Sequence, residues 1–218
     1  MIERNRFQSA VSGKSKSHPR NDVEVELVQR VASKDKTAFE QMYQSYHARL
    51  ARFIAPVVRD CSAVDLEEII NDTLFVVWLR AADFRGDSKV STWIFGIAYR
   101  IALSERKKLL AKSALHDDIE PDEVSAHCSY QQQLGTKNWV ETAMQKLSVE
   151  HQTVVRLTYW EGLSYQEIAE AMDCPVNTVK TRMHYARNKL KKSLTHSLDP
   201  QGFKTSDSDI LASLDEIL

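Results

Sequence analysis

The residues best suited to chemistry in this chain are cations gathered near its C-terminus. Between Val176 and Lys192 six side chains are basic and none is acidic. The stretch just before it, Trp160 to Asp173, carries four acids and no base. This segregation is typical of a helix that sets cations against phosphates and polar side chains against base edges. The chemistry it predicts is non-covalent recognition of nucleic acid.

Two short elements would have to position these cations. Ser164 to Glu167 reads as a capping box that starts a helix ending near Met172. Asp173-Cys174-Pro175 interrupts it, since proline is tolerated only at a helix start. The next helix has an apolar seam at Val179, Met183, Ala186 and Leu190. The pattern predicts a helix-turn-helix; the alternative is a helical hairpin with a solvated basic face.

Composition limits the classes of function. The net charge of 218 residues is −1, so nucleic-acid affinity must come from local charge. Three scattered cysteines (Cys61, Cys128 and Cys174) indicate reduced thiols rather than a disulfide framework. No apolar run approaches the roughly 20 residues of a membrane span. No nucleophile elbow or phosphate loop appears, so we expect no enzyme activity.

The apolar period is helical almost throughout, which predicts an all-α fold. Helices are expected at about 22–32, from Thr37 (with Glu40 as a capping box), 64–80, 91–112, 138–147, 148–160, 164–172 and 176–194. We expect two small helical domains, 22–112 and 136–195, joined by an acidic flexible linker, 113–135. Residues 1–21 are expected to be a disordered basic tail and 196–218 an acidic amphipathic tail. That last tail either docks on its own domain, stays disordered or covers a binding surface.

Two segments carry a family resemblance. LSYQEIAEAMDCPVNTVKTRMHYARNKL closely resembles region four of extracytoplasmic-function (ECF) sigma factors of the sigma-70 family. DLEEIINDTLFVVWLRAADFRGDSKVSTWIFGIAYRIALSERKK resembles their region two. Together they cover most of residues 22–195. The resemblance implies an RNA polymerase subunit that directs promoter-specific initiation; the alternatives are a stand-alone helix-turn-helix regulator and a sigma-like interaction module.

The resemblance also assigns roles to residues of the first domain. Glu68, Asn71 and Asp72 match positions that contact the clamp helices of the polymerase largest subunit. They lie at i, i+3 and i+4 off the apolar stripe of their helix, although a helix surface merely rich in acids would look alike. Phe84–Arg106 matches the reader of the −10 element. There we expect Trp93 and Tyr99 as pocket walls, with Trp93 equally suited to the core, and Arg100, Arg106 and Lys107 as cations beside DNA.

In the second domain the resemblance places −35 recognition on the basic helix. The matching candidates are Thr178, Lys180, Thr181, Arg182, His184, Tyr185 and Arg187. If about four cations neutralise phosphates, the log–log salt slope of binding should be about −3.6. Relatives vary at His184 and Tyr185, and they often carry Asn where this chain has Arg100. Neither a −35 nor a −10 sequence is therefore predicted.

The implied partners are promoter DNA, core RNA polymerase (clamp helices and flap) and an anti-sigma factor. The expected location is the cytoplasm, with sequestration at the inner membrane face by that anti-sigma factor and no membrane insertion. We expect no cofactor and no metal. His116, Asp117 and Asp118, like His127 and Cys128, lie in the linker without the spacing of metal ligands.

Overall fold

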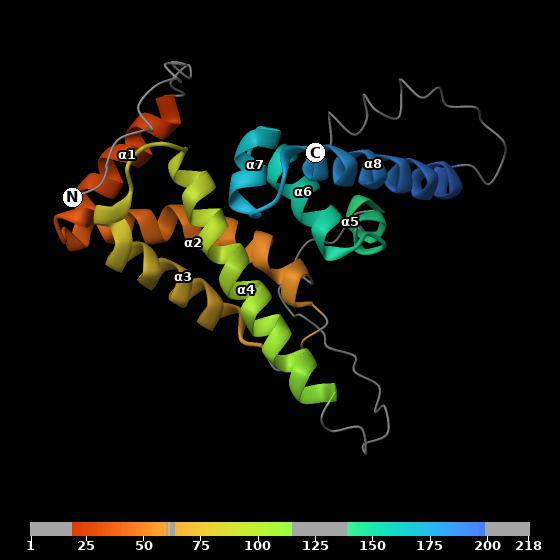
Figure 1. The fold of residues 1–218 in the computed structure, drawn as a ribbon, viewed down its shortest axis with the longest axis horizontal. Coiled ribbons are helices and arrows are strands. Elements are labelled where there is room, and N and C mark those ends of the chain that lie inside the picture. Colours follow the sequence, from red (N-terminus) through yellow and green to blue (C-terminus); the bar gives the residue numbers. More distant parts are fainter. Residues whose placement is uncertain (1–18, 60, 62–63, 115–138, 199–218) are drawn as a thin grey trace, which may run out of the picture.

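A computed structural model describes residues 19–59, 61, 64–114 and 139–198 (Figure 1). Most of the predicted tails and linker, with their metal-like residues, lie outside these ranges. At their edges the predicted boundaries are wrong, because residues 19–21, 113–114 and 196–198 continue the neighbouring helices. Within them the chain has no strand, and the predicted all-α fold is confirmed. The helices are α1 (Pro19–Ala32), α2 (Lys36–Val58), α3 (Leu66–Arg80), the 3-10 turn η1 (Ala81–Asp83), α4 (Val90–Ala114), α5 (Trp139–Gln145), α6 (Val149–Tyr159), α7 (Tyr165–Ala171) and α8 (Val176–Leu198).

The start of α2 differs from the prediction. Its N-cap is Asp35, whose carboxylate accepts from the amides of Thr37 (2.9 Å) and Ala38 (3.2 Å). The predicted capping box at Thr37 and Glu40 is wrong, because an aspartate two residues earlier already binds the free amides of the first turn. Arg30 donates to Asp35 at 2.7 Å and so fixes the entry of the chain into α2.

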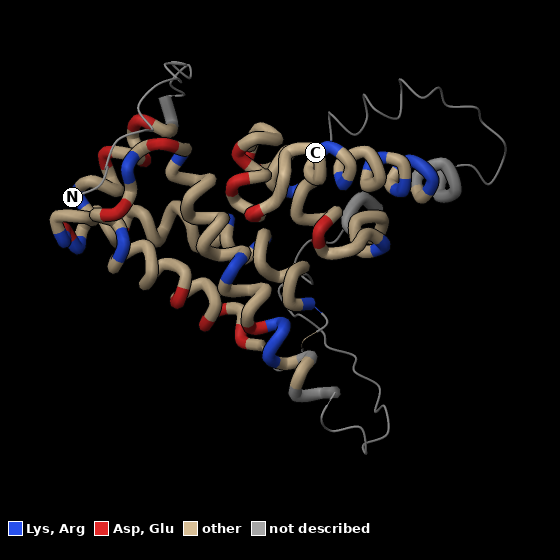
Figure 2. The backbone as a smooth tube through the Cα atoms, viewed as in Figure 1, with Lys and Arg blue, Asp and Glu red and all other residues tan. Residues whose placement is uncertain are grey.

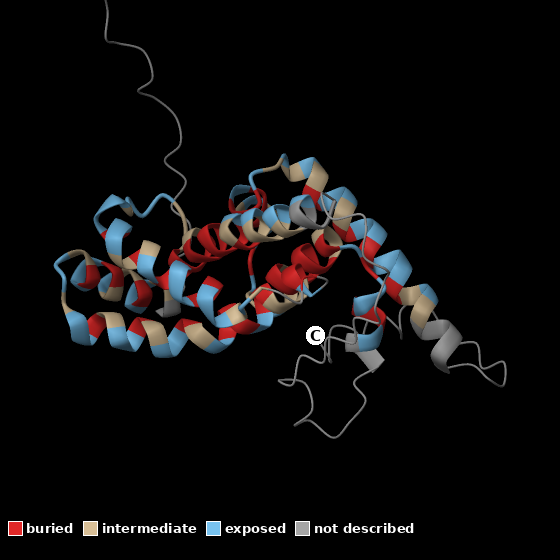
Figure 3. Cartoon of the chain, turned by 90° about the horizontal axis from the view of Figure 1, so that it is seen from below, coloured by how far each residue is buried: buried red, intermediate tan, exposed pale blue. Residues whose placement is uncertain are grey.

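Helices α1 to α4 form the N-terminal half around α2. Buried Tyr46, Leu50 and Ile54 of α2 pack with buried residues of α3 and α4. Phe53 meets Phe95 of α4 edge-on at 5.0 Å between ring centroids. Figure 3 shows the buried residues lining the inner faces of these helices. Removal of this apolar surface from water stabilises the half and positions α3 and α4.

Helices α5 to α8 form the C-terminal half. Ser148 caps α6 by accepting from the amide of His151. Leu157 of α6, Ile168 of α7 and Val179 of α8 are fully buried together in the core. A small core of this kind holds α7 and α8 in a fixed relation.

The two halves pack on each other: α4 lies against α7, and α2 against α6 (Figure 1). At Gly96 of α4 an added Cβ would lie 3.3 Å from the Ala171 Cα, so the absence of a side chain there permits close approach. In the part of the chain that the structure describes, no helix is both long and apolar enough to cross a membrane.

Candidate nucleic-acid interface

The turn between α7 and α8 is built as the sequence predicts. The amide of Glu167 donates to the Ser164 hydroxyl (3.3 Å), and the amide of Ser164 donates to the Glu167 carboxylate (2.7 Å). The predicted capping box is therefore confirmed. Asp173 turns the chain with a φ of 50°, and α8 begins directly after Pro175. Left-handed backbone is a conformation that aspartate tolerates better than most residues.

The exposed side of α8 carries most of the predicted −35 candidates. Val179, Met183, Ala186 and Leu190 are buried, as predicted for the seam. Five candidates are exposed, whereas Thr178 and Arg182 are half-buried. Figure 2 shows the Lys and Arg positions along this helix. The exposed candidates are Lys180, Thr181, His184, Tyr185 and Arg187.

Neighbouring side chains hold several of these candidates in place. Arg187 donates from Nη2 to the hydroxyl of Tyr159 on α6 at 2.6 Å. The ring centroid of Tyr185 lies 6.0 Å from that of His184 and 6.4 Å from that of His151 on α6. Tyr185 still keeps 60% of its surface exposed. A cation and an aromatic ring held at the surface suit phosphate and base contacts.

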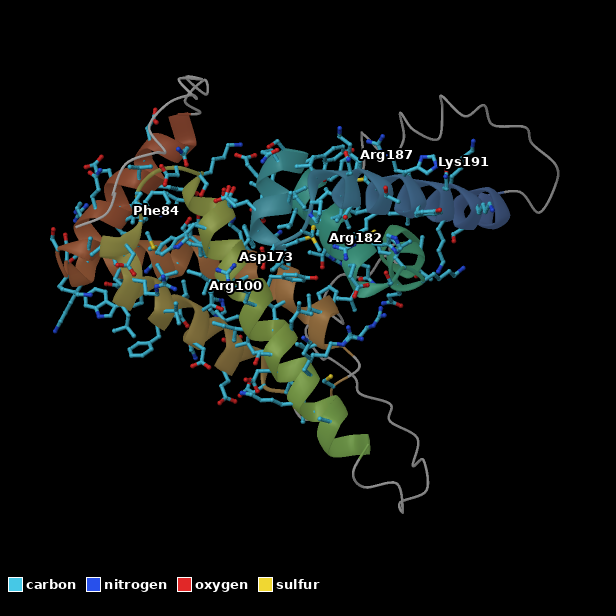
Figure 4. The ribbon with its side chains drawn as sticks, in the orientation of Figure 1. Phe84, Arg100, Asp173, Arg182, Arg187 and Lys191 are labelled. Atoms are coloured by element: carbon cyan, nitrogen blue, oxygen red, sulfur yellow. The ribbon has the colours of Figure 1, made fainter. Side chains whose placement is uncertain are left out.

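Arg182 lies apart from this group. Its Nη1 lies 3.7 Å from the Cys174 sulfur, and Figure 4 shows it on the opposite edge of α8 from Arg187 and Lys191. Its charge, with that of Arg106, acts on Glu150 of α6. Burial would raise the pKa of Glu150, but hydrogen bonds from its own amide and from Ser148, with these two cations, hold it below the usual value.

The predicted −10 candidates on α4 are divided between surface and interior. Arg100 and Lys107 are exposed, and Arg106 is half-buried. Trp93 is half-buried and packs on Phe84 at 5.3 Å, so one face of its ring belongs to the fold. Tyr99 keeps only 5% of its surface exposed, and burial raises the pKa of its hydroxyl to about 12. The structure does not bring these residues together on one exposed face.

The predicted polymerase-binding residues lie exposed on α3. Asn71 accepts at 3.1 Å from the hydroxyl of Tyr43 on α2, which fixes its amide. The basic end of α4 lies near this face. The pKa of Lys108 is raised mainly by its hydrogen bond to Glu105, and the negative charges of Asp72 and Glu68 add to this effect. A solvated acidic face of this kind can pair with Arg or Lys of a partner.

Comparison with known proteins identifies the family. Residues 137–190 match the sigma-70 region 4 family. The chain is 29% identical over 183 residues to the ECF RNA polymerase sigma-E factor of Haemophilus influenzae, which covers 77% of this chain and 93% of that one. The RNA polymerase sigma-H factor of Pseudomonas aeruginosa is 29% identical over 184 residues, covering 78% and 92%. The chain is an ECF sigma factor of the sigma-70 family.

Solved structures agree with this assignment. The sigma factor RpoE from Bartonella quintana, in complex with the anti-sigma factor NepR, is 25% identical with a TM-score of 0.57, covering 72% of this chain and 96% of that chain. CnrH, in complex with the cytosolic domain of CnrY, is 22% identical with a TM-score of 0.55, covering 80% and 99%. The second likeness bears on the fold of this sigma factor alone.

Sequence reasoning missed several surface residues of this sigma factor. Phe75 and Leu79 of α3 are 57% and 55% exposed. They follow Asp72 by three and seven residues, so they extend the acidic face with apolar surface. The sequence did contain an indication of this surface, since both residues are apolar and yet lie outside the buried stripe of α3. Tyr43 and Tyr159 gave no signal, because their roles depend on partners on other helices.

Proposed function

We propose that this sigma factor binds core RNA polymerase and directs it to promoters by contacting the −35 element with α8 and the −10 element with α4. The exposed cationic face of α8 is the observation that carries the proposal. It lies on the second helix of a capped helix-turn-helix, the arrangement in which that helix enters the major groove. The N-terminal half supplies a second surface, the face of α3 with acidic and apolar residues.

The division of labour follows the helices. Residues 22–112 would act as region 2, binding the polymerase clamp helices through Glu68, Asn71 and Asp72 and the −10 element through α4. Residues 136–195 would act as region 4 on the −35 element and the polymerase flap, and residues 113–135 would link the two. Exposed Phe75 and Leu79 support the α3 assignment, because partly apolar patches rimmed by charge are typical of protein interfaces.

Control by an anti-sigma factor is part of the proposal. Its support is the likeness to RpoE, which was solved in complex with the anti-sigma factor NepR. In this scheme the sigma factor acts in the cytoplasm and responds to stress when its anti-sigma partner releases it. Sequestration at the inner membrane face would then depend on the partner, not on a membrane segment of the described helices.

Transcription with purified core polymerase tests this function. Specific transcripts whose 5′ ends share upstream −10 and −35 elements would support it. Duplex binding without transcripts would instead indicate a stand-alone regulator, and polymerase binding without transcripts an interaction module.

A paired variant tests the polymerase face. Substitution of both Glu68 and Asp72 by Ala should weaken core binding by roughly tenfold, because two exposed partner charges are lost. The control is Glu40→Ala, an exposed acid on α2. Equal core affinity of both variants would contradict the assignment of α3.

A further inference from the structure

Tyr185 is a large aromatic side chain on the predicted −35 surface of α8, and 60% of it is exposed. An exposed side chain on a helix can occupy several rotamers, and ordering it when DNA binds costs free energy. A neighbour that already fixes the ring in the free protein would reduce this cost. The structure places such a neighbour on a different helix.

That neighbour is His151 of α6. Its ring centroid lies 6.4 Å from that of Tyr185, and the two ring planes meet at 61°, which is the edge-to-face geometry that aromatic pairs prefer. Tyr185 also has an edge contact with His184, at 6.0 Å between centroids, but these two residues are consecutive on α8. The contact with His151 therefore fixes the tyrosine ring across the boundary between α6 and α8.

His151 is itself fixed at the start of α6. Its Nδ1 lies 2.7 Å from the Oγ of Ser148, which is the N-cap of the helix. Val149 and Gln152, on either side of this turn, are buried in the C-terminal half. A ring that contacts this imidazole is therefore fixed relative to the core that holds α8.

The charge around His151 favours the packing of its ring. Burial lowers the pKa of His151, and the cations of Arg182 and Lys189 lower it further. Glu150 acts in the opposite direction but does not reverse the shift. Because the ordinary pKa of this group is 6.5, the imidazole is neutral near pH 7. A neutral ring loses less hydration than an imidazolium when it packs on a tyrosine.

The ring pair lies among side chains suited to DNA. Lys189, whose charge acts on His151, is exposed and lies one turn beyond Tyr185. Asn188 is also exposed, and its Nδ2 lies 2.9 Å from the Nε2 of His184. Cations of this kind bind phosphates, whereas amide and aromatic side chains contact base edges. His151 thus lies at the edge of the predicted −35 surface although it belongs to α6.

We propose that His151 is a positioning residue of the −35 surface, which fixes the ring of Tyr185 for contact with bases before duplex DNA binds. The inference rests on the proposed function, because it requires α8 to be the helix that contacts the −35 element. A ring ordered in the free protein loses less conformational freedom on binding, so the contact should raise affinity. A fixed ring also meets one base position in place of several, so the contact should raise selectivity.

Binding of the full chain to duplex DNA tests this role. Selection from a pool of duplexes with randomised sequence gives the base preferences, and fluorescence anisotropy on the selected duplex gives the affinity. His151→Gln removes the ring but keeps a polar group that can bind Ser148. It should weaken binding by about two- to tenfold, the range expected for one aromatic pair. It should also relax the base preference at the same position that Tyr185→Ala relaxes.

Two further variants separate positioning from a general effect on the fold. His151→Phe keeps a ring without the ring nitrogens and should restore most of the affinity. In a chain that already carries Tyr185→Ala, His151→Gln should cause no further loss, because His151 acts through that ring. The matched control is His47→Ala, which removes a half-buried imidazole 5.3 Å from the ring of Tyr43 on α2 and should leave duplex binding unchanged.

Circular dichroism checks that each variant is folded, and His151→Leu replaces His151→Gln if the latter loses helicity. Three results would each overturn the role of His151: parent affinity in the variant without the ring, the same loss with and without Tyr185, or no recovery in His151→Phe. If the parent chain selects no sequence from the pool, the proposed function of α8 fails and this role fails with it. If the parent and the variant without the ring select the same sequence with equal affinity, only the role of His151 fails.

Discussion

Helices α8 and α4 carry the two sets of predicted promoter contacts, and they present them differently. On α8, Lys180, His184 and Arg187 stand in solvent over a buried apolar seam. On α4, Tyr99 is buried and Trp93 is packed on Phe84. The candidate residues of α8 are therefore accessible to solvent, whereas two of the candidate residues of α4 are packed against other side chains of the protein.

The difference follows from what each helix packs against. On α8 the side chains of Lys180, Arg187 and Lys189 are exposed, so these cations remain solvated. The corresponding side of α4 meets α7. A surface that must bind bases extruded from the stack needs aromatic rings, and such rings are also the side chains that a neighbouring helix covers most favourably. Covering α4 therefore stabilises the fold, and it would at the same time obstruct the proposed contacts of α4 with the −10 element.

The largest expected effect tests the buried charges that join α2 to the loop after α6. Arg49→Ala would remove the cation that pairs with two buried carboxylates, Glu24 and Glu161. The free energy of unfolding should fall by about 3–5 kcal/mol, as for other broken buried pairs. Urea unfolding followed by circular dichroism measures it, with Arg52→Ala on the exposed side of α2 as control. A loss no greater than that of the control would show that the group does not stabilise the fold.

The second prediction compares an exposed and a half-buried cation of α8. In the free chain, Lys180→Ala should weaken binding to a −35 duplex by about 1–3 kcal/mol, the range of a good base contact. Arg182→Ala should cost less than half as much, because Arg182 is half-buried and lies beside Cys174. Fluorescence anisotropy at fixed salt measures both. A larger loss for Arg182 would mean that this side chain, although half-buried, can still reach DNA.

A smaller effect concerns how Arg187 is held. Tyr159→Phe removes the hydroxyl that accepts from Arg187 at 2.6 Å. Duplex affinity should fall by about 0.5–1.5 kcal/mol, the net value of one hydrogen bond, with no change in salt slope. Arg187→Ala, by contrast, should reduce the magnitude of the slope by about one, because it removes a phosphate contact. Equal slopes for the parent and Arg187→Ala would remove Arg187 from the phosphate contacts.

The comparison also explains which features were predictable. The helix-turn-helix came directly from the sequence, because the Ser164–Glu167 cap and Pro175 are local signals with a fixed structural meaning. The helix start at Asp35 was missed, since two possible caps lay within three residues and only geometry selects between them.

The junction between the halves could not be predicted. Arg49 and Glu161 are 112 positions apart, and nothing in the local pattern of either indicates a partner. The burial of Tyr99 could not be predicted either, because its position along α4 is compatible with an exposed base-contacting residue and with a core residue. Long-range packing therefore decided the state of the α4 surface, whereas short-range signals were sufficient for α8.

The smallest expected effect is the part of the acid dependence of stability that comes from Glu167 at the start of α7. Burial acts to raise the pKa of Glu167, but the Ser164 backbone and Lys89 hold it below its ordinary value of 4.5. A depressed pKa contributes stability above the ordinary value that is lost as pH falls through the folded value. Between Val176 and Lys192 there is no carboxyl group to respond in this way.

Glu167→Gln isolates this effect, because glutamine can complete the same capping box without titrating. Between about pH 5 and pH 3, the free energy of unfolding should fall less steeply in the variant than in the parent chain. Glu150, whose pKa is also lowered, should keep part of the slope. Urea unfolding at four or five pH values measures the difference. Parallel curves would mean that the Lys89–Glu167 contact adds no proton-linked stability, so that the covering of α4 would depend on the buried Arg49 group and on apolar packing.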